Sequence, residues 1–112
     1  MNTANNQYSL TIRMPKDMYD KLDMVSKQIG FTKVTFIRIA IYTYLVDSKE
    51  PLSFQNIDST DKHRFALNVN QSTYDLLTEA SELYSQSINS IVISLVSAYL
   101  EFFAKVLPEL EL

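Results

Sequence analysis

The chain has 112 residues, of which 46% are hydrophobic, and this length and composition predict one globular domain. It contains no cysteine, which excludes a disulfide framework, thiolate zinc sites and cysteine nucleophiles and suits a cytoplasmic protein. The net charge of −3 argues mildly against a protein that coats nucleic acid through charge alone.

The charge is divided unevenly along the chain. Residues 1–46 carry six Lys and Arg against three Asp, a net charge of +3. Residues 63–112 carry two basic residues against six acidic residues, a net charge of −4, and the segment between them adds −2. The two halves are therefore expected to meet a charged partner differently.

The first predicted element is a strand over residues 8–15, which follows a polar arm at residues 1–7. Successive side chains of a strand point to opposite faces, and apolar and polar residues alternate here. The residues that share the apolar face are Tyr8, Leu10, Ile12 and Met14. The residues that share the polar face are Ser9, Thr11 and Arg13.

Two helices are predicted after Pro15. Apolar residues at positions 18, 22, 25 and 29 have the spacing of an amphipathic helix, and Gly30 follows where a left-handed cap is favoured. Thr32 is placed to cap a second helix, in which apolar pairs recur every four residues as far as Leu45.

Residues 47–62 lack a sustained hydrophobic period and contain a proline and several charges, so they are interpreted as a linker. Sixteen extended residues reach about 50 Å, enough to bring a second strand beside the first. Phe54 and Ile57 are expected to pack on the surface without determining the fold.

The second half repeats the first at a constant offset of 55 residues, from a strand over residues 63–70 to a final helix capped by Ser87. Only six of 36 aligned pairs between residues 10–45 and 65–100 are identical. Sliding can bring any two helices into phase, but a strand and two helices in phase without a gap indicate a repeat. The apolar strand residues are Phe65, Leu67 and Val69, and the polar-face residues are Arg64, Ala66 and Asn68.

The most apolar stretch lies in this last helix, between residues 88 and 107. Polar residues interrupt it at helical intervals, which favours a buried helix of a soluble protein over a membrane span. Pro108 is expected to end the helix and to leave a short acidic tail.

A short strand, a helix, a hydroxyl-capped turn and an apolar helix together resemble the ribbon-helix-helix family of DNA-binding repressors, the Arc and MetJ type. The closest similarity is the segment Gly30-Phe31-Thr32-Lys33-Val34-Thr35-Phe36-Ile37-Arg38. In the second unit Ser87-Ile88-Asn89-Ser90 resembles the Arc version of this turn, although Ser85 stands where a glycine is expected.

The resemblance implies a mostly α-helical fold with a two-stranded antiparallel β-ribbon. It implies two units in tandem, residues 1–46 and 63–112, that form one folded domain as an intramolecular pseudo-dimer. It also implies that double-stranded DNA is the partner and that the ribbon enters the major groove. The implied base-contacting residues are Ser9, Thr11, Arg13, Arg64, Ala66 and Asn68. The implied phosphate-contacting residues are Thr32, Lys33, Val34, Thr35, Ser87 and Asn89.

The resemblance predicts a transcriptional regulator, a repressor, that recognises a non-palindromic element and self-associates with adjacent molecules on DNA. The first strand is expected to carry more of the DNA contact. The alternative is a protein-interaction module, antitoxin-like or an inhibitor, that keeps the fold without DNA binding. A third possibility keeps DNA binding but exchanges units between two chains. The polar residues on the ribbon and the hydroxyl caps also fit a purely structural role.

An enzyme is not predicted. His63 is the only histidine and is expected to be solvated, and no His, Asp and Glu cluster has metal-ligand spacing. The single glycine excludes a glycine-rich phosphate loop. Neither a cofactor, a metal, a small-molecule substrate nor a membrane is expected as a partner.

Overall fold

The computed structural model describes residues 7–47, 54 and 62–106. These residues are mostly helical and include one two-stranded antiparallel sheet, so the predicted fold class is confirmed at this level. The predicted arm, linker and tail lie outside the described residues, apart from Gln7, Asp47, Phe54 and Lys62. The elements are β1 (Gln7–Pro15), α1 (Lys16–Ile29), α2 (Lys33–Tyr42), η2 (Thr43–Asp47), β2 (Lys62–Asn70), α3 (Gln71–Tyr84) and α4 (Ile88–Val106).

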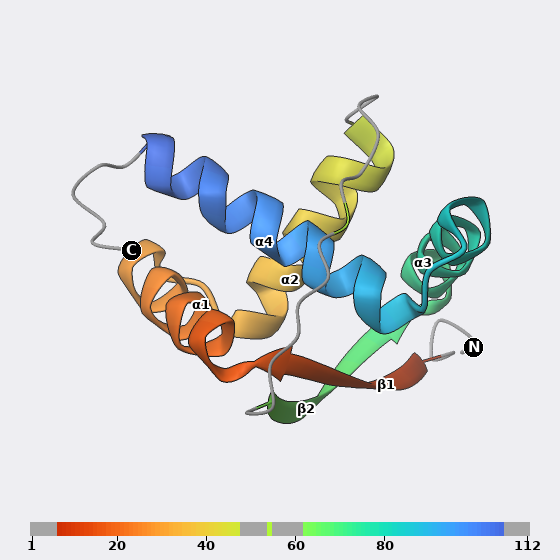
Figure 1. Ribbon diagram of the computed structural model, residues 1–112, viewed down its shortest axis with the longest axis horizontal. Coiled ribbons are helices and arrows are strands. Elements are labelled where there is room, and N and C mark those ends of the chain that lie inside the picture. The colour runs from red at the N-terminus through yellow and green to blue at the C-terminus, as the bar shows by residue number, and fades with distance from the viewer. Residues whose placement is uncertain (1–6, 48–53, 55–61, 107–112) are drawn as a thin grey trace, which may run out of the picture.

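The strands β1 and β2 form a ribbon along one side of the four α-helices (Figure 1). Their antiparallel register runs from Gln7 opposite Asn70 to Pro15 opposite Lys62. One face of the ribbon is apolar and the other is polar, as the alternation in the sequence predicts. The ribbon therefore covers the helices with one face and presents the other to solvent.

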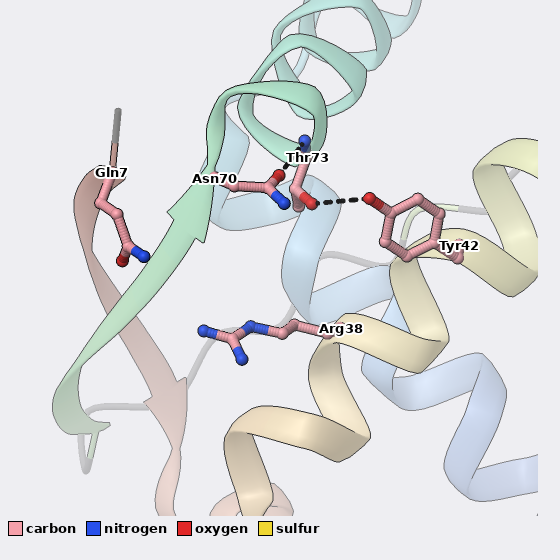
Figure 2. Close-up of a pocket in the computed structure, with 5 residues that line it drawn as sticks. All are labelled: Gln7, Arg38, Tyr42, Asn70 and Thr73. Atoms are coloured by element: carbon pink, nitrogen blue, oxygen red, sulfur yellow. Dashed lines mark hydrogen bonds between the residues drawn. The ribbon is translucent and has the colours of Figure 1, made fainter. Parts of the chain in front are cut away.

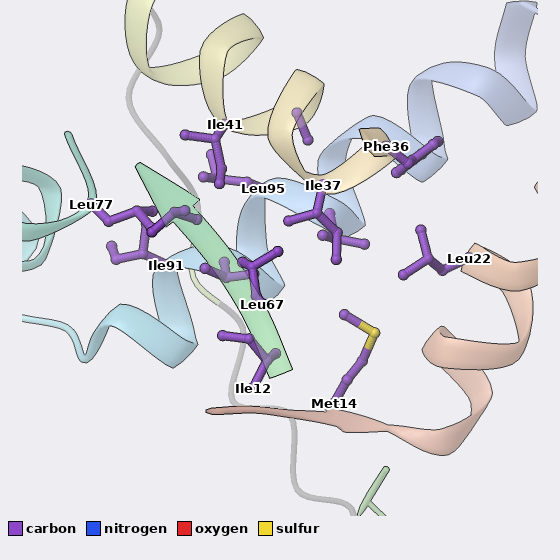
Figure 3. Packing of buried hydrophobic residues seen from close by; sticks show 14 of the residues in the cluster. Ile12, Met14, Leu22, Phe36, Ile37, Ile41, Leu67, Leu77, Ile91 and Leu95 are labelled. Carbon is purple, nitrogen blue, oxygen red and sulfur yellow. The ribbon is translucent and has the colours of Figure 1, made fainter. Parts of the chain in front are cut away.

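The core lies between the ribbon and the helices (Figure 3). The strands contribute Ile12, Met14, Leu67 and Val69, none more than 1% exposed. Burying one such aliphatic side chain stabilises the fold by about 1.5–3 kcal/mol, so this face fixes the side of the ribbon that meets the helices. The helices contribute Leu22, Val25, Phe36, Ile37, Ala40, Ile41, Leu77, Ala80, Ile91, Val92, Leu95, Val96 and Leu100 to the same cluster.

The helices α1 and α3 end in the same way, although only the first is followed by glycine. Gly30 has φ 82° and Ser85 has φ 54°, both in the left-handed region. In each turn a backbone N–H donates to a serine carbonyl five residues earlier, from Phe31 at 2.9 Å and from Gln86 at 3.1 Å. This pattern is a Schellman cap. The serine at position 85 therefore does not change the path of the second turn.

The starts of α2 and α4 are capped as predicted. The Thr32 hydroxyl accepts a hydrogen bond from the Thr35 N–H at 3.1 Å, and the Ser87 hydroxyl accepts one from the Ser90 N–H at 3.1 Å. The predicted second helix is less regular at its end, because the α-helix stops at Tyr42 and a π-helical turn continues to Asp47.

By length and composition alone α4 could cross a membrane, and so could α1 with residues 33–47 if that bent pair were one span. In the structure α4 has six buried side chains, and five of them belong to the core cluster beneath the ribbon and between the helices. The remaining residues of α4 are half-buried or exposed.

Candidate nucleic-acid interface

The six predicted base-contacting residues all lie on the solvent face of the ribbon. Each is exposed, and the register places them in three cross-strand pairs. The pairs are Ser9 with Asn68, Thr11 with Ala66, and Arg13 with Arg64. Since all six sit on one twisted two-stranded ribbon, they form a single surface of the width that a major groove admits.

The pair of Arg13 and Arg64 places two positive charges directly opposite each other. Like charges at opposed positions destabilise a strand pair, so this arrangement has an energetic cost in the free protein. Lys62, the next outward residue of β2, adds a third positive charge at the same end of the ribbon. Within residues 7–47 and 62–106, no carboxylate forms an ion pair with these three side chains. The surface is therefore complementary to an anion.

The first candidate phosphate site is the start of α2. The Thr35 N–H is used by the Thr32 cap and the Phe36 N–H donates to the Thr32 carbonyl at 3.0 Å. The earlier N–H groups, those of Lys33 and Val34, have no acceptor within the helix because of where they lie in its first turn. They carry the positive end of the helix dipole and suit a phosphate oxygen.

The Lys33 side chain forms an ion pair with α1 and does not extend freely into solvent. Its Nζ lies 2.7 Å from Asp23 Oδ1 and 5.4 Å from the ring centroid of Tyr19. Hydrogen bonds from Lys33 and then from Lys27 hold the pKa of Asp23 below its ordinary value of 3.8. The Asp23 hydrogen bond raises the pKa of Lys33 above 10.5. A phosphate at α2 would therefore compete with Asp23 for this lysine, which the sequence alone did not indicate.

The start of α4 is the second candidate phosphate site, but the Asn89 side chain there serves the ribbon. Asn89 Oδ1 accepts a hydrogen bond from the Arg13 N–H at 2.8 Å, and its Nδ2 donates to the Arg13 carbonyl at 3.1 Å. Only the backbone near Ser87 and Asn89 remains suited to a phosphate. The offset of 55 aligns Asn89 with Val34, whose side chain cannot form such bonds.

Arg38, which the sequence suggested only as part of the turn motif, connects α2 to the other end of the ribbon. Its Nη2 donates a hydrogen bond to the Asn68 carbonyl at 2.7 Å. Beside it, a small pocket is lined by Gln7, Arg38, Tyr42, Asn70 and Thr73 (Figure 2). The Tyr42 hydroxyl lies 3.1 Å from the Thr73 hydroxyl. The pocket thus borders the end of the ribbon that carries amide side chains.

His63 is not the solvated side chain that the sequence suggested. It is half-buried, and its ring stacks on Tyr19 with centroids 3.9 Å apart. The stacking is explained by the register, which brings His63 opposite Met14 and close to the start of α1. In the described part of the chain no group of three His, Cys, Asp or Glu side chains is placed to hold a metal ion.

Comparison of the chain with protein-family models, with curated proteins and with solved structures finds no match.

Proposed function

We propose that this protein is a sequence-specific DNA-binding transcriptional regulator, a cytoplasmic repressor, that inserts its ribbon into the major groove. The observation that carries the proposal is the opposed pair of Arg13 and Arg64 on an exposed ribbon face, where no carboxylate of residues 7–47, 54 or 62–106 forms an ion pair with either side chain. Such a pair is costly alone and favourable beside the electronegative N7 and O6 edge of guanine, which arginine binds bidentately.

A tandem ribbon-helix-helix arrangement supports this function. Adding 55 to the bounds of β1 and α1 reproduces those of β2 and α3, and adding 55 to the first residue of α2 gives that of α4. The same offset relates Thr11 to Ala66, which face each other at the centre of the register. A two-fold axis through this central pair would exchange the two units, as in an intramolecular pseudo-dimer of the ribbon-helix-helix type.

The other predicted base-contacting residues also have side chains that can recognise bases. Asn68 can pair with adenine, and the methyl groups of Thr11 and Ala66 can contact the methyl group of thymine. The N–H groups at the starts of α2 and α4 would hold phosphates on either side of the ribbon. Three cross-strand pairs read few base pairs, and each wrong base pair costs about 1–3 kcal/mol, so adjacent molecules are expected to bind cooperatively.

The direct test is retention of the protein on duplex DNA at low salt. Affinity should fall steeply as salt rises, because phosphate contacts release counterions. Arg13→Ala should weaken binding to a selected site by about 1–3 kcal/mol, the worth of one bidentate arginine–guanine contact. Lys105→Ala is the matched control, since it removes the same charge from the exposed last turn of α4. Absence of retention at low salt, or equal losses for both variants, would contradict the proposal.

The second candidate function is a protein-interaction module that keeps the fold without binding DNA. It is favoured by the exposed carboxylates that α3 presents, those of Asp75, Glu79 and Glu82. On this alternative the protein would be antitoxin-like or an inhibitor, and its partner would be basic. Failure to bind any duplex, together with a fold that is intact in solution, would support it.

A further inference from the structure

The outward face of the ribbon changes in chemical character from one end to the other. Its three cross-strand pairs are Arg13 with Arg64, then Thr11 with Ala66, then Ser9 with Asn68. The first pair holds both positive charges, the middle pair carries methyl groups, and the last pair carries a hydroxyl and an amide. Gln7 opposite Asn70 extends the amide end, and Lys62 extends the basic end.

This polarity comes from two positions at which the two units carry different residues. The offset of 55 relates Ser9 to Arg64 and Arg13 to Asn68. If the second strand carried the same outward residues as the first, in the order Ser, Thr and Arg, each end of the ribbon would hold one arginine opposite one serine. In this chain the arginine of the second strand is residue 64, opposite Arg13, and not residue 68, opposite Ser9. Both arginines therefore lie at one end of the ribbon. The charge is thus separated by ribbon end and not by strand.

Each end is fixed to a different helix. The backbone of Arg13 is held by both polar atoms of Asn89 on α4, at 2.8 Å and 3.1 Å. At the opposite end the Asn68 carbonyl accepts from Arg38 on α2, at 2.7 Å. The two ends of the ribbon are therefore held in place relative to the helices whose first turns would contact the flanking phosphates.

We infer, on the basis of the proposed function, that the protein recognises a directional DNA element with its guanines gathered at one end and A·T pairs over the rest. The distance along the ribbon from the arginine pair to the serine–asparagine pair is four residues, about 14 Å at roughly 3.4 Å per residue. That length covers about four base pairs at 3.4 Å each. Arginine selects guanine, the methyl groups favour thymine, and Asn68 favours adenine.

The experiment is a selection of bound sequences from a random duplex pool, made with the natural protein and with Arg64→Ser combined with Asn68→Arg. The double variant keeps the net charge and changes only exposed side chains, and the Arg38 bond to the Asn68 backbone does not require the asparagine amide. Thermal unfolding of both proteins confirms that they fold.

The natural protein should enrich one motif with guanines in one half only, and replacing one of these guanines should weaken binding roughly 5- to 150-fold. The double variant should enrich a motif with guanines at both ends. A natural motif with guanines at both ends, or one that the double variant leaves unchanged, would overturn the inference while leaving DNA binding intact. No enriched motif for two folded proteins would overturn the proposed function and this inference with it.

Discussion

At the scale of single residues, Asn89 shows how far two equivalent positions have diverged. Its side chain satisfies both backbone polar groups of Arg13. The equivalent position in the first unit is Val34, which is half-buried and apolar. The sequence predicts that Asn89 contacts a phosphate, but in the structure its side chain positions the backbone of Arg13, a predicted base-contacting residue.

Replacing Asn89 with the valine of the first unit should therefore affect both stability and DNA binding. Loss of two hydrogen bonds is expected to lower the free energy of unfolding by about 1–2 kcal/mol, measured by urea denaturation. Affinity for a selected DNA site should also fall, because the backbone of Arg13 is no longer held. Gln28→Ala on the exposed face of α1 is the control. Unchanged unfolding and unchanged affinity in Asn89→Val would show that the two bonds do not position Arg13.

At the scale of elements, most of the fold could be predicted because the spacing of apolar residues in the sequence indicates which side of a strand or helix is buried. The alternation in residues 8–15 and 63–70 identified both faces of the ribbon, and Thr32 and Ser87 identified two helix starts. Period does not report which side chains of distant elements meet. The contacts of Asn89, Arg38, Asp23 and His63 all depend on tertiary packing, and therefore they were missed.

The two left-handed helix ends provide a matched pair of tests. The left-handed conformation costs a non-glycine residue roughly 1–2 kcal/mol of folding free energy. Glycine avoids this cost, but it offsets part of the gain because it increases the conformational entropy of the unfolded chain. Ser85→Gly should therefore stabilise the protein by about 0.5–1 kcal/mol, and Gly30→Ser should destabilise it by a similar amount.

A side chain at position 30 would meet no atom within 4 Å, so the expected loss is a backbone effect and not a clash. Thermal unfolding of the two variants and of the parent measures both shifts. Stabilisation by Gly30→Ser, or destabilisation by Ser85→Gly, would mean that these two residues do not take the left-handed conformation in solution.

At the scale of the whole molecule, both strands of the ribbon come from one chain. The paired residues are far apart in sequence, as Gln7 opposite Asn70 shows. Their apolar faces and the four α-helices share one core cluster. Residues 7–47 contain one strand and residues 62–106 contain one strand, so in the described part of the chain each strand finds its partner in the other half.

The free protein should therefore sediment as a monomer of 12.9 kDa over a wide range of concentrations. Its ribbon requires no second copy. Analytical ultracentrifugation at low and high protein concentration measures this directly. A species of twice that mass that dissociates on dilution would support the exchange of units between two chains instead.

The single-chain ribbon also has a consequence for the cell that makes this protein. Where two chains must meet to form a ribbon, few ribbons exist at low copy number, and their number rises with the square of the number of chains. Here residues 16–61 join the two strands covalently, and the second strand is present at an effective concentration set by that connection. The number of complete ribbons then equals the number of chains, so a few molecules suffice and the response to synthesis is linear.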